Sequence, residues 1–185
     1  ALRLATRGEG DLDVSGAMAT FIDQPGMPLV SVEILPHGQV RLAQRRFHNA
    51  GVTVKEQRWR VPVSLKFSDG KTVTTRTVLL TEAQQVVPLT DGELAWVFPL
   101  AEAAGYYRFR LPGAQLQRLS RDARDALTPA ERVALLGNLG ALLNAGELGA
   151  DQLLRTLAFF GDDPHPRVLA AALEVLDRVR GALVT

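Results

Sequence analysis

The chain has 185 residues, of which 46% are apolar and 22% charged, with a net charge of +1 and no cysteine. A high apolar content with so little net charge excludes an intrinsically disordered chain, and the lack of cysteine excludes a disulfide framework and thiolate chemistry. The balanced charge gives no sign of a nucleic-acid-binding protein, and no apolar run is long enough to span a membrane.

The N-terminal residues 1–27 are expected to form a short connecting segment. A brief helix is predicted through Met18, Phe21 and Ile22, whose spacing follows the helical period. Residues 24–28 end this helix, because proline cannot continue it. An amphipathic helix this short is marginal by itself, which predicts that it packs against a neighbouring domain.

Residues 28–111 have the pattern of short β-strands, most clearly over 59–67, where apolar and polar residues alternate. The sequence 68–71 contains an Asp-Gly pair between two such runs, which predicts a hairpin with a type I′ turn. The alternation slips between 42 and 47, which predicts a β-bulge. About seven short strands separated by turn signals predict an immunoglobulin-like β-sandwich.

Residues 112–185 change to the helical period. Thr128 and Glu131 form a capping box around a proline at the first helical position, and Gly146 is a natural residue to end that helix. Short connections predict antiparallel neighbours in an open stack like that of helical repeats. The helices are expected over 115–127, 129–145, 150–160 and 166–183.

No catalytic centre is recognisable from the residues. The histidines, His37, His48 and His165, are scattered, and no HExxH zinc motif occurs. Asp162 and Asp163 lie beside His165, where a metal site is one interpretation, but Asp163 is expected to be a helix cap. Neither a serine-hydrolase motif nor a phosphate-binding glycine loop is present. The sequence therefore predicts no catalytic and no metal-binding residue in this chain.

Arginine is frequent in the predicted strands, which raises an RNA-binding sheet as an alternative. Trp59, however, alternates with Arg58 and Arg60, so it is expected to point into the core and not to lie beside them. A solvated outer face, or a surface that contacts another domain, is the favoured interpretation.

Three stretches, in order, carry a resemblance to a known family. They are 21–32 with the strand 40–47, the run 59–63, and Trp96-Val97 followed by 105–109. Together they resemble the segment that follows the catalytic domain in zinc aminopeptidases of the aminopeptidase N type, the gluzincin family with an HExxH site. The resemblance covers about residues 14–185, although residues 97–100 stand where the family usually has an Asn.

This resemblance implies three parts: the tail of a catalytic domain (1–27), a β-sandwich domain (28–111) and the start of a C-terminal helical domain (112–185). It places the HExxH site and its zinc upstream, so it implies a parent peptidase that removes N-terminal amino acids from peptides. This chain alone is expected to be inactive and without a cofactor. Its implied role is structural, positioning the helical domain over the active site.

The implied partner is the parent's own catalytic domain, with Phe21, Gln24, Tyr106 and Arg108 as candidate interdomain contacts. Strand alternation predicts that Tyr106 faces outward and that Tyr107 points into the core. No nucleic acid and no membrane is expected as a partner, and the location is expected to be the bacterial cytoplasm. The isolated fragment is expected to self-associate through apolar surfaces at both of its ends.

Two alternatives remain open from the sequence. One is a stand-alone β-sandwich module that binds other proteins. The other is an enzyme whose motif is not recognisable.

Overall fold

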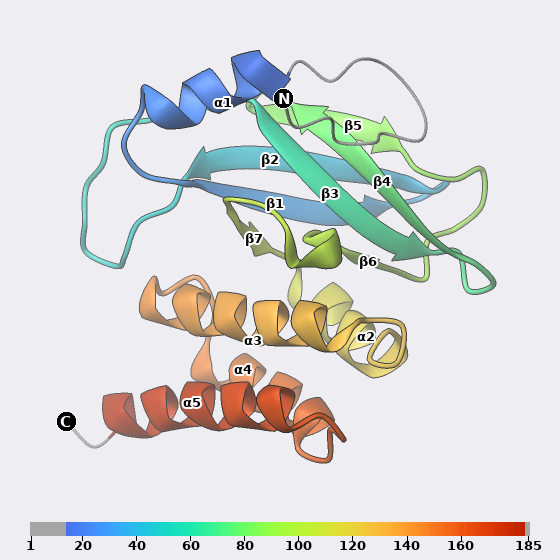
Figure 1. Ribbon diagram of the computed structural model, residues 1–185, viewed down its shortest axis with the longest axis vertical. Coiled ribbons are helices and arrows are strands. Elements are labelled where there is room, and N and C mark those ends of the chain that lie inside the picture. The colour runs from blue at the N-terminus through green and yellow to red at the C-terminus, as the bar shows by residue number, and fades with distance from the viewer. Residues whose placement is uncertain (1–13, 184–185) are drawn as a thin grey trace.

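The computed structural model describes residues 14–183, so residues 1–13 of the predicted connecting segment lie outside it. Two β-sheets occupy one end of the molecule and the later helices the other (Figure 1). The elements in chain order are α1 (Val14–Ile22), β1 (Pro28–Leu35), β2 (Gln39–Arg46), β3 (Val61–Ser68), β4 (Val73–Leu80), β5 (Gln84–Pro88), β6 (Trp96–Phe98), η1 (Ala101–Ala103), β7 (Arg108–Arg110), α2 (Gly113–Asp122), α3 (Pro129–Asn144), α4 (Ala150–Leu157), η2 (Ala158–Phe160) and α5 (Pro166–Leu183).

The strands form one sheet of order β5-β2-β1-β7 and a second of order β4-β3-β6. All paired strands are antiparallel except β1 and β7, which are parallel. Apolar side chains from both sheets belong to one continuous core, which also includes residues of the helices. The predicted combination of β-sheets followed by helices is therefore confirmed.

The hairpin between β3 and β4 is confirmed, but its predicted type I′ turn is wrong. That turn needs a positive φ at both central residues, and only Gly70 has one, at 91°. Asp69 instead accepts hydrogen bonds from the backbone N–H groups of Lys71 (2.9 Å) and Thr72 (2.8 Å). The side chain of Asp69 thus stabilises a wider loop.

The bulge predicted in β2 is also wrong, because the ladder between β1 and β2 is unbroken along both strands. The apolar pattern slips because a polar residue, Gln44, takes an inward position. Its Nε2 donates to the carbonyl oxygens of Trp59 (2.8 Å) and Glu82 (3.0 Å), and its Oε1 accepts from the Trp59 N–H (2.9 Å). Gln44 therefore ties the larger sheet to the chain that leads into β3.

The helices match their predicted positions closely. The capping box of α3 is present, with Glu131 N–H donating to Thr128 Oγ1 and Thr128 N–H donating to Glu131 Oε2. The helix ends at Asn144, and Gly146 follows it with a φ of 71°. Helix α4 continues into η2, and α5 has its predicted bounds, whereas α2 ends earlier than expected, at Asp122.

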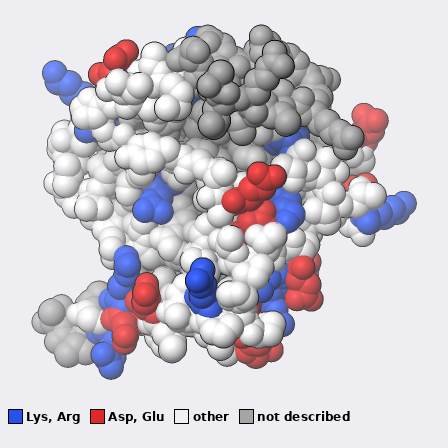
Figure 2. All heavy atoms as spheres, viewed as in Figure 1, with Lys and Arg blue, Asp and Glu red and all other residues white. Residues whose placement is uncertain are grey.

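Helix α3 lies between the sheets and the outermost helix α5, and it contacts β7, η1, α4 and α5 (Figure 1). Figure 2 shows acidic and basic side chains spread over both the sheets and the helices on the face in view. Over the described part of the chain, none of the helices has the length and apolar character needed to cross a membrane.

Candidate interdomain surface

Helix α1 carries an apolar face that the described residues leave exposed. Met18 is 54% exposed and Ile22 is 76% exposed. Ala17 is buried and Phe21 is half-buried, so these two residues attach the helix to the sheets. Of the three apolar residues used to predict the helix, only Phe21 packs on the core.

Phe21 joins a buried aromatic residue to an exposed one. Its ring lies 6.5 Å from that of Trp59 in a stacked arrangement, and 6.0 Å from that of Tyr106 in an edge-to-face arrangement. Trp59 is 1% exposed, so it does not lie beside the arginines as an RNA-binding sheet would need. Tyr106 is 63% exposed, so the structure brings Phe21 and Tyr106 together at the surface.

Gln24 fixes the end of α1 to the segment that leads into β3. Its Nε2 donates to the carbonyl oxygens of Arg58 (3.1 Å) and Thr20 (3.3 Å). The hydroxyl of Thr20 in turn accepts a hydrogen bond from Arg60 N–H (3.2 Å). The contacts of Gln24 therefore hold α1 in place and do not join it to Tyr106.

Tyr106 and Tyr107 face opposite ways, as predicted. Tyr107 is buried, and its hydroxyl donates to the carbonyl of Pro99 (2.7 Å) and accepts from Ser64 N–H (3.1 Å). Burial raises the pKa of the Tyr107 hydroxyl, so this group stays protonated and remains a donor. Tyr107 thereby links the segment before β7 to β3.

Arg108 lies on the outward side of β7, the same side as Tyr106 in the strand alternation. Its partner in β1 is Leu29, which also pairs with Arg45 of β2. The Nε atom of Arg108 is buried and has no acceptor among the described residues. A buried donor without a partner is unusual in a folded protein.

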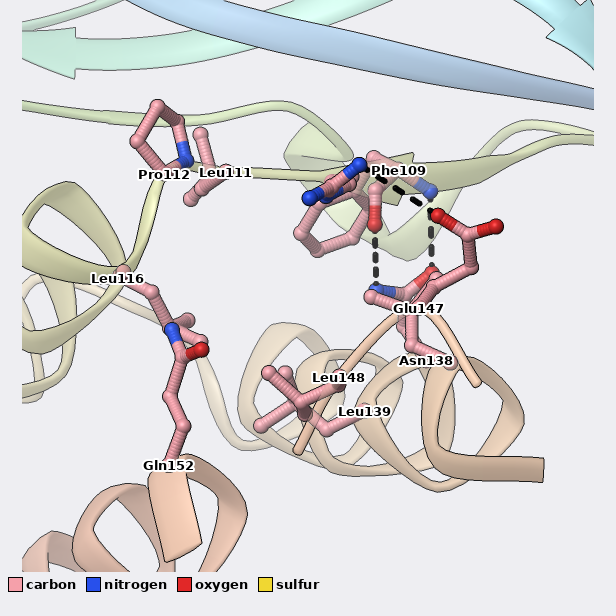
Figure 3. A pocket seen from close by; sticks show the side chains of 12 residues that line it. Phe109, Leu111, Pro112, Leu116, Asn138, Leu139, Glu147, Leu148 and Gln152 are labelled. Atoms are coloured by element: carbon pink, nitrogen blue, oxygen red, sulfur yellow. Dashed lines mark hydrogen bonds and ion pairs between the residues drawn. The ribbon is translucent and has the colours of Figure 1, made fainter. Parts of the chain in front are cut away.

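The junction between sheets and helices relies on amide side chains that the sequence analysis did not identify. Asn138 of α3 donates from Nδ2 to the Phe109 carbonyl (2.8 Å) and accepts from Phe109 N–H at Oδ1 (3.0 Å) (Figure 3). Gln115 of α2 makes the same pair of bonds with the backbone of Ile34 in β1 (3.0 and 3.2 Å). Each helix therefore holds one strand through two hydrogen bonds.

Glu131 extends the α3 cap to the sheets. Its carboxylate binds Lys66 Nζ of β3 (2.9 Å) and the backbone N–H of Glu102 (2.9 Å), in addition to the cap at Thr128. Burial by itself raises the pKa of Glu131, but the hydrogen bonds from Lys66, Thr128 and Glu102 outweigh it, and the pKa lies below its ordinary value. Glu131 therefore remains ionised while it links three segments.

Glu147, just after α3, forms ion pairs with Arg45 of β2 and Arg110 of β7. Beside it, a cavity of about 60 Å³ lies between β7 and the helices α2, α3 and α4 (Figure 3). A volume this small holds water, not a peptide substrate. The side chains that line it are mostly apolar, and they contain no arrangement of nucleophile and base.

The described residues contain no group of three or more side chains that suits a metal ion. Asp163, weighed above as a metal ligand or a cap, accepts a hydrogen bond from His165 N–H (3.0 Å) and forms a buried ion pair with Arg132 (2.8 Å). These contacts secure the loop before α5. The residues present do not fit a zinc site.

Comparisons with known proteins give consistent matches. Residues 96–185 match the sequence model of the ERAP1-like C-terminal domain. The chain is 27% identical over 154 residues to a puromycin-sensitive aminopeptidase of Caenorhabditis elegans, a match that covers 79% of this chain and 16% of the relative. Over 174 residues it is 24% identical to aminopeptidase 2 of Candida albicans, covering 93% of this chain and 19% of the relative.

A third relative is endoplasmic reticulum aminopeptidase 2 of Bos taurus, which is 25% identical over 179 residues. That match covers 90% of this chain and 18% of the relative. The chain therefore spans less than a fifth of the length of these three relatives.

Proposed function

Because this chain is related to the segment that follows the catalytic domain in zinc aminopeptidases of the aminopeptidase N type, we propose that it is a non-catalytic part of such an enzyme. The parent enzyme removes N-terminal amino acids from peptides, and its zinc is held by the catalytic domain outside this chain. This chain alone has no peptidase activity.

The two sheets are the immunoglobulin-like sandwich of residues 28–111, and the helices of 112–185 open the C-terminal helical domain. The match to the ERAP1-like C-terminal domain covers all of these helices, and it begins earlier, at residue 96 in β6. Leu173 of α5 is 62% exposed and Leu176 is 44% exposed. Further helices of the parent cover these residues, as expected for an open helical stack.

The role of the segment is to hold the helical domain at a fixed position relative to the catalytic domain. The observation that carries this proposal is the pair of amide bridges, Asn138 to Phe109 and Gln115 to Ile34. Each bridge gives a helix a two-point attachment to strand backbone, and a two-point attachment resists rotation. With the helical domain fixed over the active site, domain geometry sets which peptides reach it.

The catalytic domain contacts the exposed side of α1 and the neighbouring part of β7. Met18, Ile22 and Tyr106 give an apolar, partly aromatic surface, which is the usual composition at the centre of an interface. The ring of Phe21 packs edge-to-face against that of Tyr106, and the half-buried Arg108 lies on the same outward side of the chain as Tyr106. Gln24 keeps α1 at the angle that presents this surface.

The test uses the full-length parent enzyme with Asn138→Ala, and with Asn144→Ala as the matched control at an exposed position of the same helix. We expect Asn138→Ala to leave kcat/KM unchanged for an amino acid joined to a small chromophore and to change kcat/KM for long peptides. Equal kcat/KM ratios to the unmodified enzyme for both substrates would show that the link does not control access. An equal loss for both substrates would also contradict the proposal, because it would place Asn138 in support of the active site itself.

A further inference from the structure

Within residues 14–183, the two sheets end in four edges without a neighbouring strand, and three of these edges are short or capped. Strand β7 has three residues, and the Asn138 side chain already forms hydrogen bonds with the backbone N–H and carbonyl of its central residue, Phe109. Strand β6 also has three residues, and β5 has five and ends in Pro88. Short edge strands, proline and covered backbone are the devices by which proteins prevent edge-to-edge pairing.

Strand β4 is the fourth edge, and its only device of this kind is one inward-pointing charged residue. It has eight residues, the β3–β4 ladder is regular along its whole length, and it contains neither lysine nor proline. Its single charged residue is Arg76, whose guanidinium donates a hydrogen bond to the Pro88 carbonyl of β5 (2.9 Å). The outward side chains Val73, Thr75 and Thr77 are exposed and uncharged.

We propose that β4 pairs antiparallel with β4 of a second copy of this chain, which joins the two smaller sheets into one six-stranded sheet. Opposed residues in an antiparallel pair point to the same face of the sheet. A two-fold axis perpendicular to the sheet must therefore lie midway between one residue and its own copy in the partner strand. An axis through Arg76 would place two like charges opposite each other, which is unfavourable.

An axis between the two copies of Thr77 removes this repulsion and pairs residues 74–80 of one strand with the same residues of the other. Thr77 then lies opposite its own copy and Thr75 lies opposite Leu79. Arg76 lies opposite Val78. The outward face is therefore built from β-branched and apolar pairs, which stabilise antiparallel strands. The net charge of +1 per chain adds little repulsion between copies.

The first experiment measures the molar mass of the chain in solution by light scattering over a wide range of protein concentration. We expect twice the 20.1 kDa of one chain at high concentration. Thr77→Lys places two lysines opposite each other and should raise the dissociation constant about tenfold or more. Val52→Lys is the matched control, because Val52 is an exposed residue of the segment between β2 and β3, which lies on the opposite side of the protein from β4 (Figure 1), and it should not change the dissociation constant.

The second experiment uses the absence of cysteine in the chain. Opposed residues at the two-fold axis have Cα atoms about 5 Å apart, which is within the range that a disulfide spans. Thr77→Cys should therefore form a covalent dimer under mild oxidation. Thr75→Cys is the control, because the two copies of residue 75 lie about 13 Å apart along the paired strands, and it should not cross-link.

A monomer at every concentration would overturn the proposal. So would equal dissociation by Thr77→Lys and Val52→Lys, or equal cross-linking at 75 and 77. A dimer that Thr77→Lys leaves intact but Ile22→Glu or Leu176→Glu disrupts would show that the copies associate through α1 or α5. None of these outcomes bears on whether the parent is an aminopeptidase, since the edge of β4 lies apart from α1 and the amide bridges.

Discussion

The side-chain amide of Asn138 pairs with the backbone of Phe109 as a neighbouring strand would. Both atoms of the amide are used, at 2.8 and 3.0 Å, and both residues are buried. Helix α3 thereby completes the edge of the larger sheet at β7. This pairing makes the junction between sheets and helices depend on the chemistry of one side chain.

Replacing Asn138 should weaken the junction in a graded way. Asn138→Ala leaves a buried N–H and a buried carbonyl of Phe109 without partners, and the free energy of unfolding should fall by about 2–4 kcal/mol. Asn138→Asp keeps an acceptor for Phe109 N–H but sets a carboxylate against the Phe109 carbonyl, so it should be at least as destabilising at neutral pH. Urea unfolding followed by circular dichroism measures both.

The control for this series is Asn144→Ala, at the exposed end of the same helix, which should change the free energy of unfolding by less than about 0.5 kcal/mol. If Asn138→Ala were as mild as Asn144→Ala, the two hydrogen bonds would not be what holds α3 against β7.

Glu131 should make the protein sensitive to acid. Its pKa is lowered in the folded state from an ordinary value of 4.5, so the folded state binds its proton less readily than the unfolded state. The stability that Glu131 contributes is present above that ordinary pKa and is lost as the pH falls through the folded pKa. Glu131→Gln should therefore lower stability at neutral pH and flatten its dependence on pH in the acid range.

The matched control is Asp122→Asn. The pKa of Asp122 is also lowered, first through its hydrogen bond from Arg121, but the pair is solvent-exposed, and exposed pairs contribute little to stability. Unfolding free energies measured from neutral to acid pH should show a smaller change for Asp122→Asn than for Glu131→Gln. The reverse order would mean that the Lys66–Glu131–Glu102 link does not stabilise the fold.

Local patterns in the sequence predicted the elements whose causes are local. The capping box placed the start of α3, and strand alternation gave opposite directions for Tyr106 and Tyr107, because these features depend on residues a few positions apart. The position of the turn after β3 was predicted, but its type was not, because the Asp69 side chain accepts hydrogen bonds that a comparison of turn types does not consider.

The amide bridges were not predictable in the same way, because each joins residues far apart in the chain. Gln115 lies 81 positions from Ile34, and Asn138 lies 29 positions from Phe109. The available signal was a polar residue in an apolar row: Asn138 interrupts the leucines of α3, and Gln44 interrupts the inward row of β2. Such a residue shows that the interior contains a polar partner, but the sequence does not show which one.

Gln44 offers a test of this signal with an unusual pH dependence. Gln44→Glu removes the donor to the Trp59 and Glu82 carbonyls and buries a carboxylate beside them, so burial should raise the pKa of the new carboxyl in the folded state. A raised pKa means that the folded state takes up the proton more readily. The variant should therefore be strongly destabilised at neutral pH and recover part of its stability as the pH falls.

Gln44→Leu is the control, since it restores the apolar alternation and has no titrating group. It should lose about 1–3 kcal/mol because the Trp59 backbone is left unpaired, with no recovery in acid. Thermal unfolding at several pH values would distinguish the two variants, and parallel pH profiles would contradict the assignment of Gln44 as a buried donor.

The exposed face of α1 should behave differently in the isolated chain and in the parent enzyme. Ile22 is 76% exposed here, so Ile22→Glu should change the free energy of unfolding of the isolated chain by less than about 0.5 kcal/mol. Phe21→Ala, which removes the contacts with Trp59 and Tyr106, should destabilise the isolated chain. In the full-length parent, Ile22→Glu should lower the melting temperature as well, because a charge would then be buried against the catalytic domain. An Ile22→Glu variant that is neutral in both proteins would show that the catalytic domain does not cover α1.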